Sequence, residues 1–302
     1  MFDKRYRFLV NVNHHAYDSM EDEKYLSKFF YYQTNYPLNL SNPQTFNEKM
    51  QWLKINNRNS YYTLMVDKYE AKRIVGSRVG YSHVVKTLGV YDTFDEIDFN
   101  KLPSKFVLKC THGCGRMFIC KNKEEINVKK LAKMFDAALR ENYFYHTREW
   151  PYKNVKPRII AEEFIADDSF STLVVYKVFC FNGVPTIIQV IQDDKQPNET
   201  IDYFDVNWNL LDLKQNFPNS VNHISKPTKL EEMLSLSKEF SKGFPFLRTD
   251  WYIVGGRVLF SEFTFFSDAG LEPFHPNKWD VELGSLIELP NSWNYIDSSI
   301  GT

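Results

Sequence analysis

The chain has 302 residues, of which 43% are hydrophobic and 25% are charged, and its formal net charge is −1. These values suit a soluble globular protein with one large or two modest domains, and they do not indicate a nucleic-acid partner. Four cysteines are too few for a disulfide framework in a chain of this length. No apolar run suits a signal peptide or a transmembrane segment, so a cytoplasmic protein is expected.

Residues 1–85 are expected to form a mostly helical N-terminal segment. Residues 18–34 repeat aromatic side chains at helical spacing after an acidic start, which predicts an amphipathic helix. In the next expected helix, Thr45 and Glu48 have the spacing of a capping box, in which each residue satisfies a backbone N–H group near the other.

A third helix is expected over residues 61–77, and it carries charged residues at several positions. Asp67 and Lys68 are adjacent near its middle. Lys72 and Arg73 are interpreted as part of a solvated helix face, which is the usual place for basic residues on a helix.

The segment 86–165 is expected to contain a strand, a glycine turn, a strand, a helix and a strand, in that order. Lys109 ends a strand of buried residue types, and a Gly-x-Gly turn follows at once. Glycines let backbone N–H groups approach an anion, and the lysine adds a positive charge, so the turn is a candidate phosphate cradle. An ordinary hairpin turn is the alternative. The candidate residues are Lys109, His112, Gly113, Gly115 and Arg116.

The same segment offers a candidate zinc site in Cys110, His112, Cys114 and Cys120. This spacing differs from the C-x₂-C spacing of zinc knuckles. Adjacent strand residues also point to opposite faces, which disfavours joint ligation. Zinc is therefore the weaker of the two interpretations.

A further strand, expected over residues 157–165, ends in a pair of glutamates. Such a strand end can offer backbone groups to a purine edge and a carboxylate to ribose hydroxyls. The alternative is one half-buried and one exposed glutamate. The candidate residues for nucleotide binding are Glu162, Glu163, Phe164 and Ile165.

Lys177 is the one charge inside the apolar strand expected over residues 172–181. A buried charge is costly unless it is paired, so Lys177 needs a neighbouring acid or an anionic ligand. The Asn182-Gly183 pair that follows is a strong signal for a hairpin turn.

A second hairpin is expected over residues 248–270, where Gly255 and Gly256 supply the positive φ angles of a two-residue turn. Asp250 and Glu262 interrupt the apolar pattern of its strands, and the turn brings them side by side. Converging carboxylates repel each other unless a cation or a proton lies between them, and hard oxygen ligands favour Mg²⁺ with a phosphate substrate. The alternative is a surface hairpin whose acids face water.

The order of these features along the chain resembles that of the ATP-grasp superfamily. The resemblance implies an α+β fold in which two α+β subdomains grip ATP between them. Residues 86–165 would form the lid subdomain with its glycine loop, and residues 166–302 would form the C-terminal subdomain with the metal carboxylates.

The resemblance also implies a role for each candidate. Lys68 and Lys109 would hold the phosphates of ATP under the loop His112–Arg116, and the segment AEEFI would hold adenine and ribose. Asp250 and Glu262 would bind Mg²⁺.

Longer motifs resemble the ATP-grasp subfamily named after the teichuronopeptide biosynthesis protein, over roughly residues 40–285. What this implies is a carboxylate–amine ligase that activates a carboxylate as an acylphosphate with ATP. Its substrates would be an amino acid and an acidic glycan or sugar nucleotide, such as a uronic acid, in capsular or other cell-surface polysaccharide synthesis. It would meet the polysaccharide machinery peripherally, through a partner. The motifs are TFNEKMQWLK, LGVYDTFDEIDF, KLPSKFVLKCTHG, REWPYKNVKPRIIAEEFI, YKVFCFNG, SKGFPFLRTDWY and SEFTF.

By the same resemblance, Arg248 and Lys177 are expected to stabilise the transferring phosphoryl group or the acylphosphate. Two positions depart from the family pattern. Thr264 replaces the asparagine that many ATP-grasp sites place two residues after the second metal carboxylate, so it is expected to be a poorer metal ligand. Asp268 adds a charge near the reaction centre, where it would orient an incoming ammonium group or serve only as a turn residue.

Three other functions stay open. A glycosyltransferase would use Asp250 to bind the metal of a nucleotide sugar, although two ordered lysines and a glycine loop suit a triphosphate better. A phosphotransferase on the same fold would need a single acceptor. The departure at Thr264 leaves a nucleotide-binding module without turnover as the third.

Overall fold

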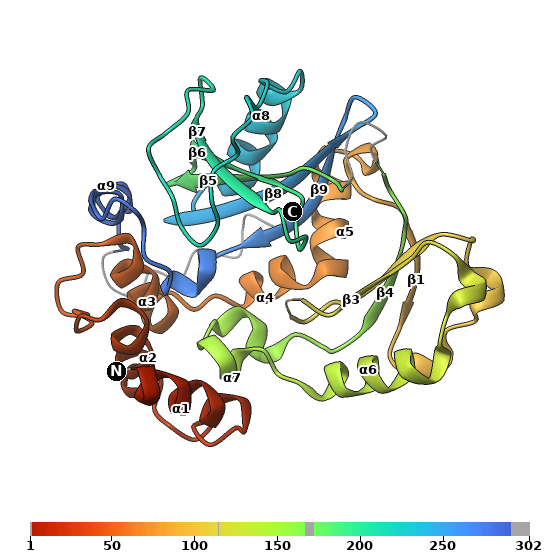
Figure 1. Cartoon of the computed structure of the whole chain (residues 1–302), viewed down its shortest axis with the longest axis horizontal. Coiled ribbons are helices and arrows are strands. Elements are labelled where there is room, and N and C mark those ends of the chain that lie inside the picture. Colours follow the sequence, from red (N-terminus) through yellow and green to blue (C-terminus); the bar gives the residue numbers. More distant parts are fainter. Residues whose placement is uncertain (1, 114, 167–171, 291–302) are drawn as a thin grey trace.

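The computed structural model describes residues 2–113, 115–166 and 172–290, and its named strands form two antiparallel sheets (Figure 1). The smaller sheet has the strand order β1-β4-β2-β3, and the larger has the order β7-β6-β5-β8-β9. Helices and antiparallel strands are mixed along the chain, which confirms the expected α+β class. The strands are β1 (Thr87–Tyr91), β2 (Phe106–Cys110), β3 (Met117–Cys120), β4 (Ile159–Glu163), β5 (Val175–Phe181), β6 (Val184–Gln192), β7 (Thr200–Asp205), β8 (Phe246–Val254) and β9 (Arg257–Thr264).

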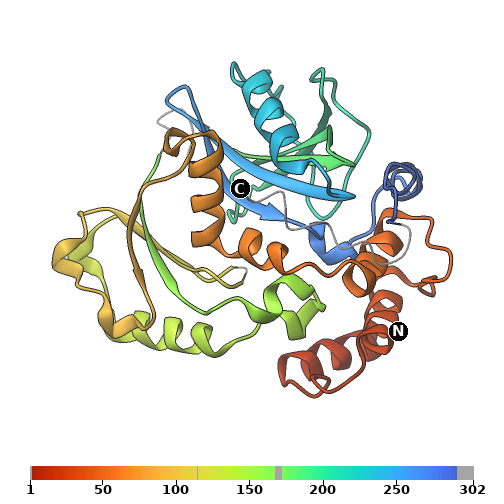
Figure 2. The same cartoon turned by 180° about the vertical axis from the view of Figure 1, so that it is seen from behind.

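The first three helices, α1 to α3, gather at one end of the molecule, away from the smaller sheet (Figure 2). Within the described part of the chain, no helix combines the length and the apolar character needed to cross a membrane. The helices are α1 (Phe2–Asn13), α2 (Asp22–Thr34), α3 (Phe46–Asn56), α4 (Ser60–Val66), α5 (Lys68–Val79), α6 (Val128–Arg140), α7 (Phe144–Thr147), α8 (Leu230–Ser241) and α9 (Lys278–Ser285).

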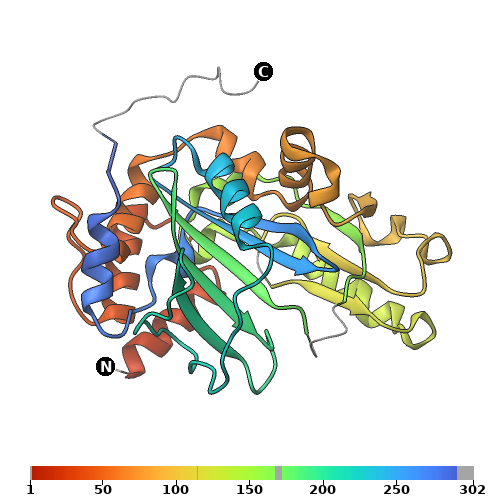
Figure 3. The same cartoon turned by 90° about the horizontal axis from the view of Figure 1, so that it is seen from above.

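The larger sheet is covered by α8 on one face, as the view from above shows (Figure 3). There the Ser237 hydroxyl of α8 accepts hydrogen bonds from Thr249 and Trp251 of β8. Strand residues alternate between faces, so Arg248 and Asp250 of β8 point to the opposite face. That face therefore carries the candidate active site.

The smaller sheet packs on α6. This helix buries Leu131 and Phe135 on one side, and the Phe135 ring stacks on Phe94 at a centroid distance of 6.0 Å. The sequence predicts this helix over residues 124–142, and in the structure it covers Val128–Arg140. A short 3₁₀ turn over Lys123–Glu125 precedes it.

The helix α1 is not among the sequence predictions. It buries Phe8 among aromatic rings, with Tyr17 at 5.1 Å and Phe29 at 5.2 Å between centroids. The helix expected over residues 18–34 begins only at Asp22. An isolated helix of 12 residues is marginal in water, so the stability of α1 comes from this aromatic cluster.

The helix expected over residues 61–77 is in fact two helices, because the chain breaks at Asp67. The Asp67 carboxylate accepts hydrogen bonds from the backbone N–H groups of Tyr69 and Glu70, so this residue is the N-cap of α5. The expected capping box of Thr45 and Glu48 is confirmed at the start of α3.

The sequence of residues 200–215 predicts a smaller hairpin with loops, and the structure has a short form of it, in which the Leu211 backbone N–H donates to the Tyr203 carbonyl at 2.8 Å. β7 ends at Asp205, and only an isolated bridge joins Phe204 to Leu210. Asp205 accepts hydrogen bonds from the backbone N–H groups of Asn207 and Asn209, which turns the chain into a loop.

Candidate active site

The hairpin of β8 and β9 places two carboxylates side by side. Asp250 lies directly opposite Glu262 across the strand pair. The connecting turn has φ angles of 56° at Gly255 and 71° at Gly256, which glycine adopts without strain. Asp250 is only 1% exposed and Glu262 is partly buried. The expected juxtaposition is therefore confirmed, and the alternative of a hairpin whose acids face water is wrong.

Each of these carboxylates has a cationic partner. Arg248 donates two hydrogen bonds to Asp250, both of 2.8 Å, and Lys68 Nζ lies 2.9 Å from Glu262 Oε2. Burial opposes ionisation of Glu262, but Lys68 and Arg248 outweigh it and hold its pKa at about 2. Burial raises the pKa of Asp250, against the opposing effect of the guanidinium.

A second buried acid, Glu162, lies between two lysines. Lys109 Nζ is 2.8 Å from Glu162 Oε2, and Lys72 forms an ion pair with the other carboxylate oxygen. Burial opposes ionisation, yet the two lysines hold the pKa of Glu162 at about 2. The interpretation of Lys72 as a solvated residue is wrong, because it is 4% exposed and also donates to the Val85 carbonyl at 2.8 Å.

The start of α5 contacts both sheets. Lys68 pairs with Glu262 of the larger sheet, and its backbone N–H donates to the Thr111 carbonyl beyond β2, at 3.1 Å. Arg158, next to β4, donates to Asp67 at 2.9 Å and to Glu70 at 3.1 Å. The N-terminus of α5 therefore lies between Lys109 of one sheet and the carboxylates of the other.

The glycine loop follows β2. Gly115 has a φ of 82° with no atom within 4 Å of an added Cβ, so its backbone conformation requires glycine while its surroundings are open. Arg116 is exposed, and Cys114 lies outside the described residues. The His112 side chain turns away from the loop and is buried, with its Nε2 3.0 Å from the Ala138 carbonyl of α6. Burial lowers the pKa of this imidazole. Only the backbone of His112 thus remains available for an anion.

The expected nucleotide-binding segment begins in β4. The Glu163 side chain is exposed, and its backbone N–H donates to the Lys86 carbonyl at 2.9 Å. Phe164 and Ile165 are partly buried just after the strand. These three residues lead from the smaller sheet toward β5, whereas Glu162 points to the lysines described above.

A left-handed turn over Ser267–Gly270 borders the carboxylates. Arg248 donates to the Ser267 hydroxyl at 2.9 Å and to the Thr264 hydroxyl at 3.1 Å. The Ser267 hydroxyl in turn donates to Asp268 at 3.0 Å. Thr264 is thus a hydrogen-bond partner of Arg248, and Asp268 is linked to Asp250 through two side chains.

This turn is strained and is held from α3. The φ angles of Asp268, Ala269 and Gly270 are 48°, 55° and 59°, and the first two residues have a Cβ that disfavours them. Lys54 Nζ donates to the Ala269 carbonyl at 2.7 Å, and Gln51 Nε2 donates to the Gly270 carbonyl at 2.6 Å.

A comparison with protein families finds a match over most of the chain. The family described as TupA-like ATP-grasp matches residues 48–288 of the chain. The chain belongs to the TupA-like ATP-grasp family. Membership confirms the expected ATP-grasp fold. No curated protein sequence matches the chain.

Solved structures similar to this TupA-like protein include amino-acid ligases. The D-alanine–D-alanine ligase from Bacillus anthracis matches 73% of this chain and 59% of its own, at 16% identity and a TM-score of 0.40. The D-alanine–D-alanine ligase from Helicobacter pylori matches 80% of this chain over 69% of its own length, at 16% identity and a TM-score of 0.42. The L-amino acid ligase from Bacillus licheniformis matches 83% of this chain over 57% of its own length, at 12% identity and a TM-score of 0.46. The chain thus spans less than two thirds of the first and third of these proteins.

A metal ion in this family member would rest on the pair Asp250 and Glu262. Within the described ranges, no three His, Cys, Asp or Glu residues form a group suited to a metal ion. The zinc interpretation loses support, because Cys120 pairs with Phe106 at the far end of the β2–β3 hairpin from Cys110. Asp250 and Glu262 do fit Mg²⁺, since both offer hard oxygen ligands and Mg²⁺ keeps its other positions for water and phosphate oxygens.

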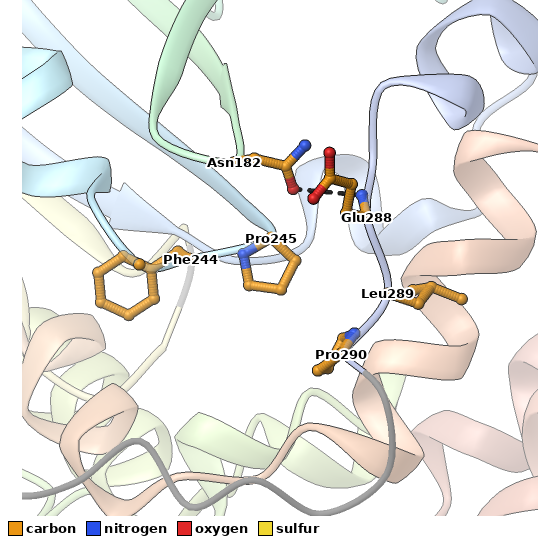
Figure 4. Close-up of a pocket in the computed structure, with 7 residues that line it drawn as sticks. Asn182, Phe244, Pro245, Glu288, Leu289 and Pro290 are labelled. Atoms are coloured by element: carbon orange, nitrogen blue, oxygen red, sulfur yellow. Dashed lines mark hydrogen bonds between the residues drawn. The ribbon is translucent and has the colours of Figure 1, made fainter.

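A shallow pocket of about 290 Å³ lies well away from these residues, at the turn between β5 and β6 (Figure 4). There the Asn182 Oδ1 accepts a hydrogen bond from the Glu288 backbone N–H at 3.2 Å. None of the residues predicted from the sequence for the active site lines it. It is lined by Asn182, Gly243, Phe244, Pro245, Glu288, Leu289 and Pro290.

The sequence does not predict three residues that lie beside the candidate site: Lys72, which is interpreted as solvated, Arg158 and Ser267. Lys72 stands one helical turn after Lys68, the position that faces the same side of a helix. This spacing is the one signal that would have placed it beside the site.

Proposed function

We propose that the protein is an ATP-dependent carboxylate–amine ligase that works through an acylphosphate. The observation that carries the proposal is the convergence of Lys68, Lys109 and the pair Asp250 and Glu262, which come from three separate parts of the chain. Two lysines facing two carboxylates suit a polyphosphate and its divalent cation.

In this proposal the lysines and the glycine loop position the nucleotide. Lys68 and Lys109 neutralise phosphate charge, and the backbone of Gly113 and Gly115 approaches the phosphates. Glu163, Phe164 and Ile165 lie where the adenine and ribose would be held. The smaller sheet acts as a lid that excludes water from the reactive intermediate.

Asp250 and Glu262 would hold Mg²⁺, with Thr264 as the weaker candidate because its hydroxyl already accepts from Arg248. When bound, the ion supplies positive charge against the β- and γ-phosphates. Arg248 and Lys177 lie on the same face as the carboxylates, since Lys177 is opposite Asp250 and Arg248 is two residues before it.

The proposed reaction begins with transfer of the γ-phosphoryl group to a substrate carboxylate, which gives an acylphosphate and ADP. Arg248 and Lys177 stabilise the charge on the transferring group. The amine nitrogen then attacks the acyl carbon, the C–O bond to phosphate breaks, and inorganic phosphate leaves. No side chain forms a covalent bond, so the protein acts by positioning and charge neutralisation.

We propose an amino acid and a uronic acid or similar acidic sugar as substrates, in capsular or other surface polysaccharide synthesis. Two likenesses support this proposal: the match to the family described as TupA-like, and the resemblance of the longer sequence motifs to the subfamily named after the teichuronopeptide biosynthesis protein. Both are analogies with other proteins and do not come from the chemistry of the site. The proposed compartment is the cytoplasm, where ATP is available, with peripheral association to the polysaccharide machinery.

The test is an incubation of the full chain with ATP, Mg²⁺, amino acids and glucuronic or galacturonic acid. ADP and phosphate are expected only when both a carboxylate and an amine are present. Release of AMP and pyrophosphate would contradict the acylphosphate route, and ADP formation with one acceptor alone would indicate a phosphotransferase.

Two variants check the site. Asp250→Asn and Lys109→Ala should abolish turnover without unfolding the chain, whereas Asp212→Asn, a surface acid paired with Lys278, should retain it. Activity that survives both site variants would show that the nucleotide lies elsewhere. Thermal stabilisation by UDP-sugars but not by ATP and Mg²⁺ would favour a glycosyltransferase.

A further inference from the structure

A row of polar side chains crosses the larger sheet from Glu262 to its far edge. Glu262 lies opposite Asp250, and Asp250 lies opposite Lys177. Lys177 lies opposite Gln189, and Gln189 lies opposite Tyr203. Residues paired directly across neighbouring strands point to the same face, so the five strands form one polar strip about 19 Å long.

The neighbouring rows on β5 and β6 are apolar. Val175 lies opposite Ile191 on one side of the strip, and Phe179 lies opposite Ile187 on the other. On β5 and β6 the polar side chains of this face are therefore Lys177 and Gln189, whereas on β8 the next row also holds Arg248. The far half of this row, Gln189 and Tyr203, has no task in the nucleotide site.

A chain of hydrogen bonds fixes how Gln189 is oriented. Gln189 Nε2 donates to the Tyr203 hydroxyl at 2.7 Å, this hydroxyl donates to Gln215 Oε1 at 2.6 Å, and Gln215 Nε2 donates to the Glu272 carbonyl at 3.4 Å. A carbonyl can only accept, so the direction of the whole chain is set from its end.

The remaining oxygen of Gln189 has no hydrogen-bond partner within the described part of the chain. Gln189 is 3% exposed. Buried polar atoms are nearly always paired, so an unpaired buried acceptor beside a reaction centre fits a ligand that brings an N–H or O–H donor.

Two further acceptors border the strip on the segment that follows β9. Asp268 is exposed and Glu272 is partly buried. Asp268 accepts from the Ser267 hydroxyl at 3.0 Å, and burial raises the pKa of Glu272. Neither carboxylate has a lysine or arginine within ion-pair distance in the ranges that the structure covers, although Arg248 and Arg5 act on them at longer range.

We infer that Gln189, Asp268 and Glu272 form the binding site for the amine substrate, which would enter as an ammonium ion. This inference rests on the ligase function proposed above. An ammonium group brings three N–H donors to a place lined by oxygen acceptors, and its charge complements the two carboxylates. Lys177 lies between this subsite and Asp250 in the row. The amine would therefore lie next to the substrate carboxylate, which Lys177 and Arg248 are proposed to hold.

The experiment measures amine binding directly, by ligand-observed NMR on the full chain with Mg²⁺ and a non-hydrolysable ATP analogue. The probes are L-alanine, L-serine, L-lysine, L-glutamate and D-glucosamine. Gln189→Met removes the acceptor at similar volume, and Asp268→Asn removes the charge. The matched controls are Gln196→Met, at an exposed glutamine in a loop, and Asp212→Asn on the surface.

At least one probe is expected to bind the wild-type chain and both controls, and to bind about tenfold more weakly to Gln189→Met and Asp268→Asn. Affinity for the ATP analogue should stay within about twofold. Absence of binding to the wild-type chain, or site variants that bind amines as the controls do, would overturn the inference.

Gln189→Glu keeps the acceptors and is expected to retain binding. If Gln189→Met proves unfolded by circular dichroism, Asp268→Asn decides alone, because Asp268 is exposed and its amide needs no repacking. A different result would separate the two proposals. If the wild-type chain binds amines but forms no ADP, and the site variants bind amines more weakly, the amine subsite is supported and the ligase function is refuted.

Discussion

Replacement of Glu162 by glutamine tests the buried charge cluster of the lid sheet. Glu162 is 3% exposed and pairs with both Lys72 and Lys109. A glutamine of the same shape leaves two lysines, one of them deeply buried, without a counter-charge. Removing one member of a buried ion pair is more costly than removing a surface charge, because the partner stays desolvated.

The magnitude follows from the pKa of Glu162. It drops from an ordinary 4.5 to about 2 in the folded chain, which corresponds to about 3 kcal/mol at about 1.4 kcal/mol per pH unit. Because the folded pKa is depressed, this stabilisation is complete above about pH 4.5 and is lost as the pH falls toward 2. For a chain of this length, 3 kcal/mol corresponds to a fall of about 5 °C in Tm.

The assay is urea unfolding of Glu162→Gln and wild type at pH 7 and pH 3, with Glu163→Gln as the matched control. Glu163 is the next residue of β4, and its side chain is exposed. The free energy of unfolding should fall by about 3 kcal/mol at pH 7 and by about 1.4 kcal/mol at pH 3 for Glu162→Gln. The control should change it by less than about 0.5 kcal/mol. Equal stability of the two variants at pH 7 would refute the reasoning.

Three other substitutions probe neighbouring features. Lys72→Met should lower the free energy of unfolding by about 2 kcal/mol. Arg73→Met, on the exposed side of the same helix, should change this free energy by less than about 0.5 kcal/mol. Equal urea midpoints of the two variants would contradict the burial of Lys72. Gly270→Ala would place its Cβ 2.3 Å from the Cβ of Met50 at a φ of 59°, so we expect a loss of about 2 kcal/mol, and an unchanged Tm would show that the turn can relax. Lys54→Met removes the hydrogen bond to the Ala269 carbonyl, and the rate of ADP formation should fall while ATP affinity, measured by calorimetry, is retained; parallel losses in both would point to general unfolding instead.

The sequence is sufficient to predict the hairpin of β8 and β9, because Gly255 and Gly256 fix its turn. The same local logic finds the capping box of Thr45. Such features depend on residues close together in the chain, so a short stretch of sequence is enough to predict them. The exact pairing is not local: a regular two-residue turn would set Asp250 opposite Ser261, and a register shift between Asp250 and Trp251 sets Glu262 there instead.

Other features depend on packing between distant segments. Lys72 is buried because Glu162, 90 residues later, approaches it, and a helical pattern around Lys72 carries no sign of that partner. Gln189 and Tyr203 join the polar strip only through the pairing of separate strands, and one residue of slippage would turn them to the other face. The helix α1 is stabilised by aromatic contacts with α2 rather than by its own propensity.

The ion pairs of the active site imply how its ligands depend on each other. Each of the three cations proposed to contact phosphate is already paired with a carboxylate: Lys68 with Glu262, Lys109 with Glu162, and Arg248 with Asp250. Phosphate groups that draw the cations away expose acids, and those acids then attract a divalent ion.

Nucleotide and Mg²⁺ should therefore bind as a single unit, with each raising the affinity for the other by the same factor. The protein would thus exchange its internal ion pairs for pairs with phosphate and Mg²⁺. Calorimetric titrations of ATP with and without Mg²⁺ that gave equal affinities would contradict this exchange.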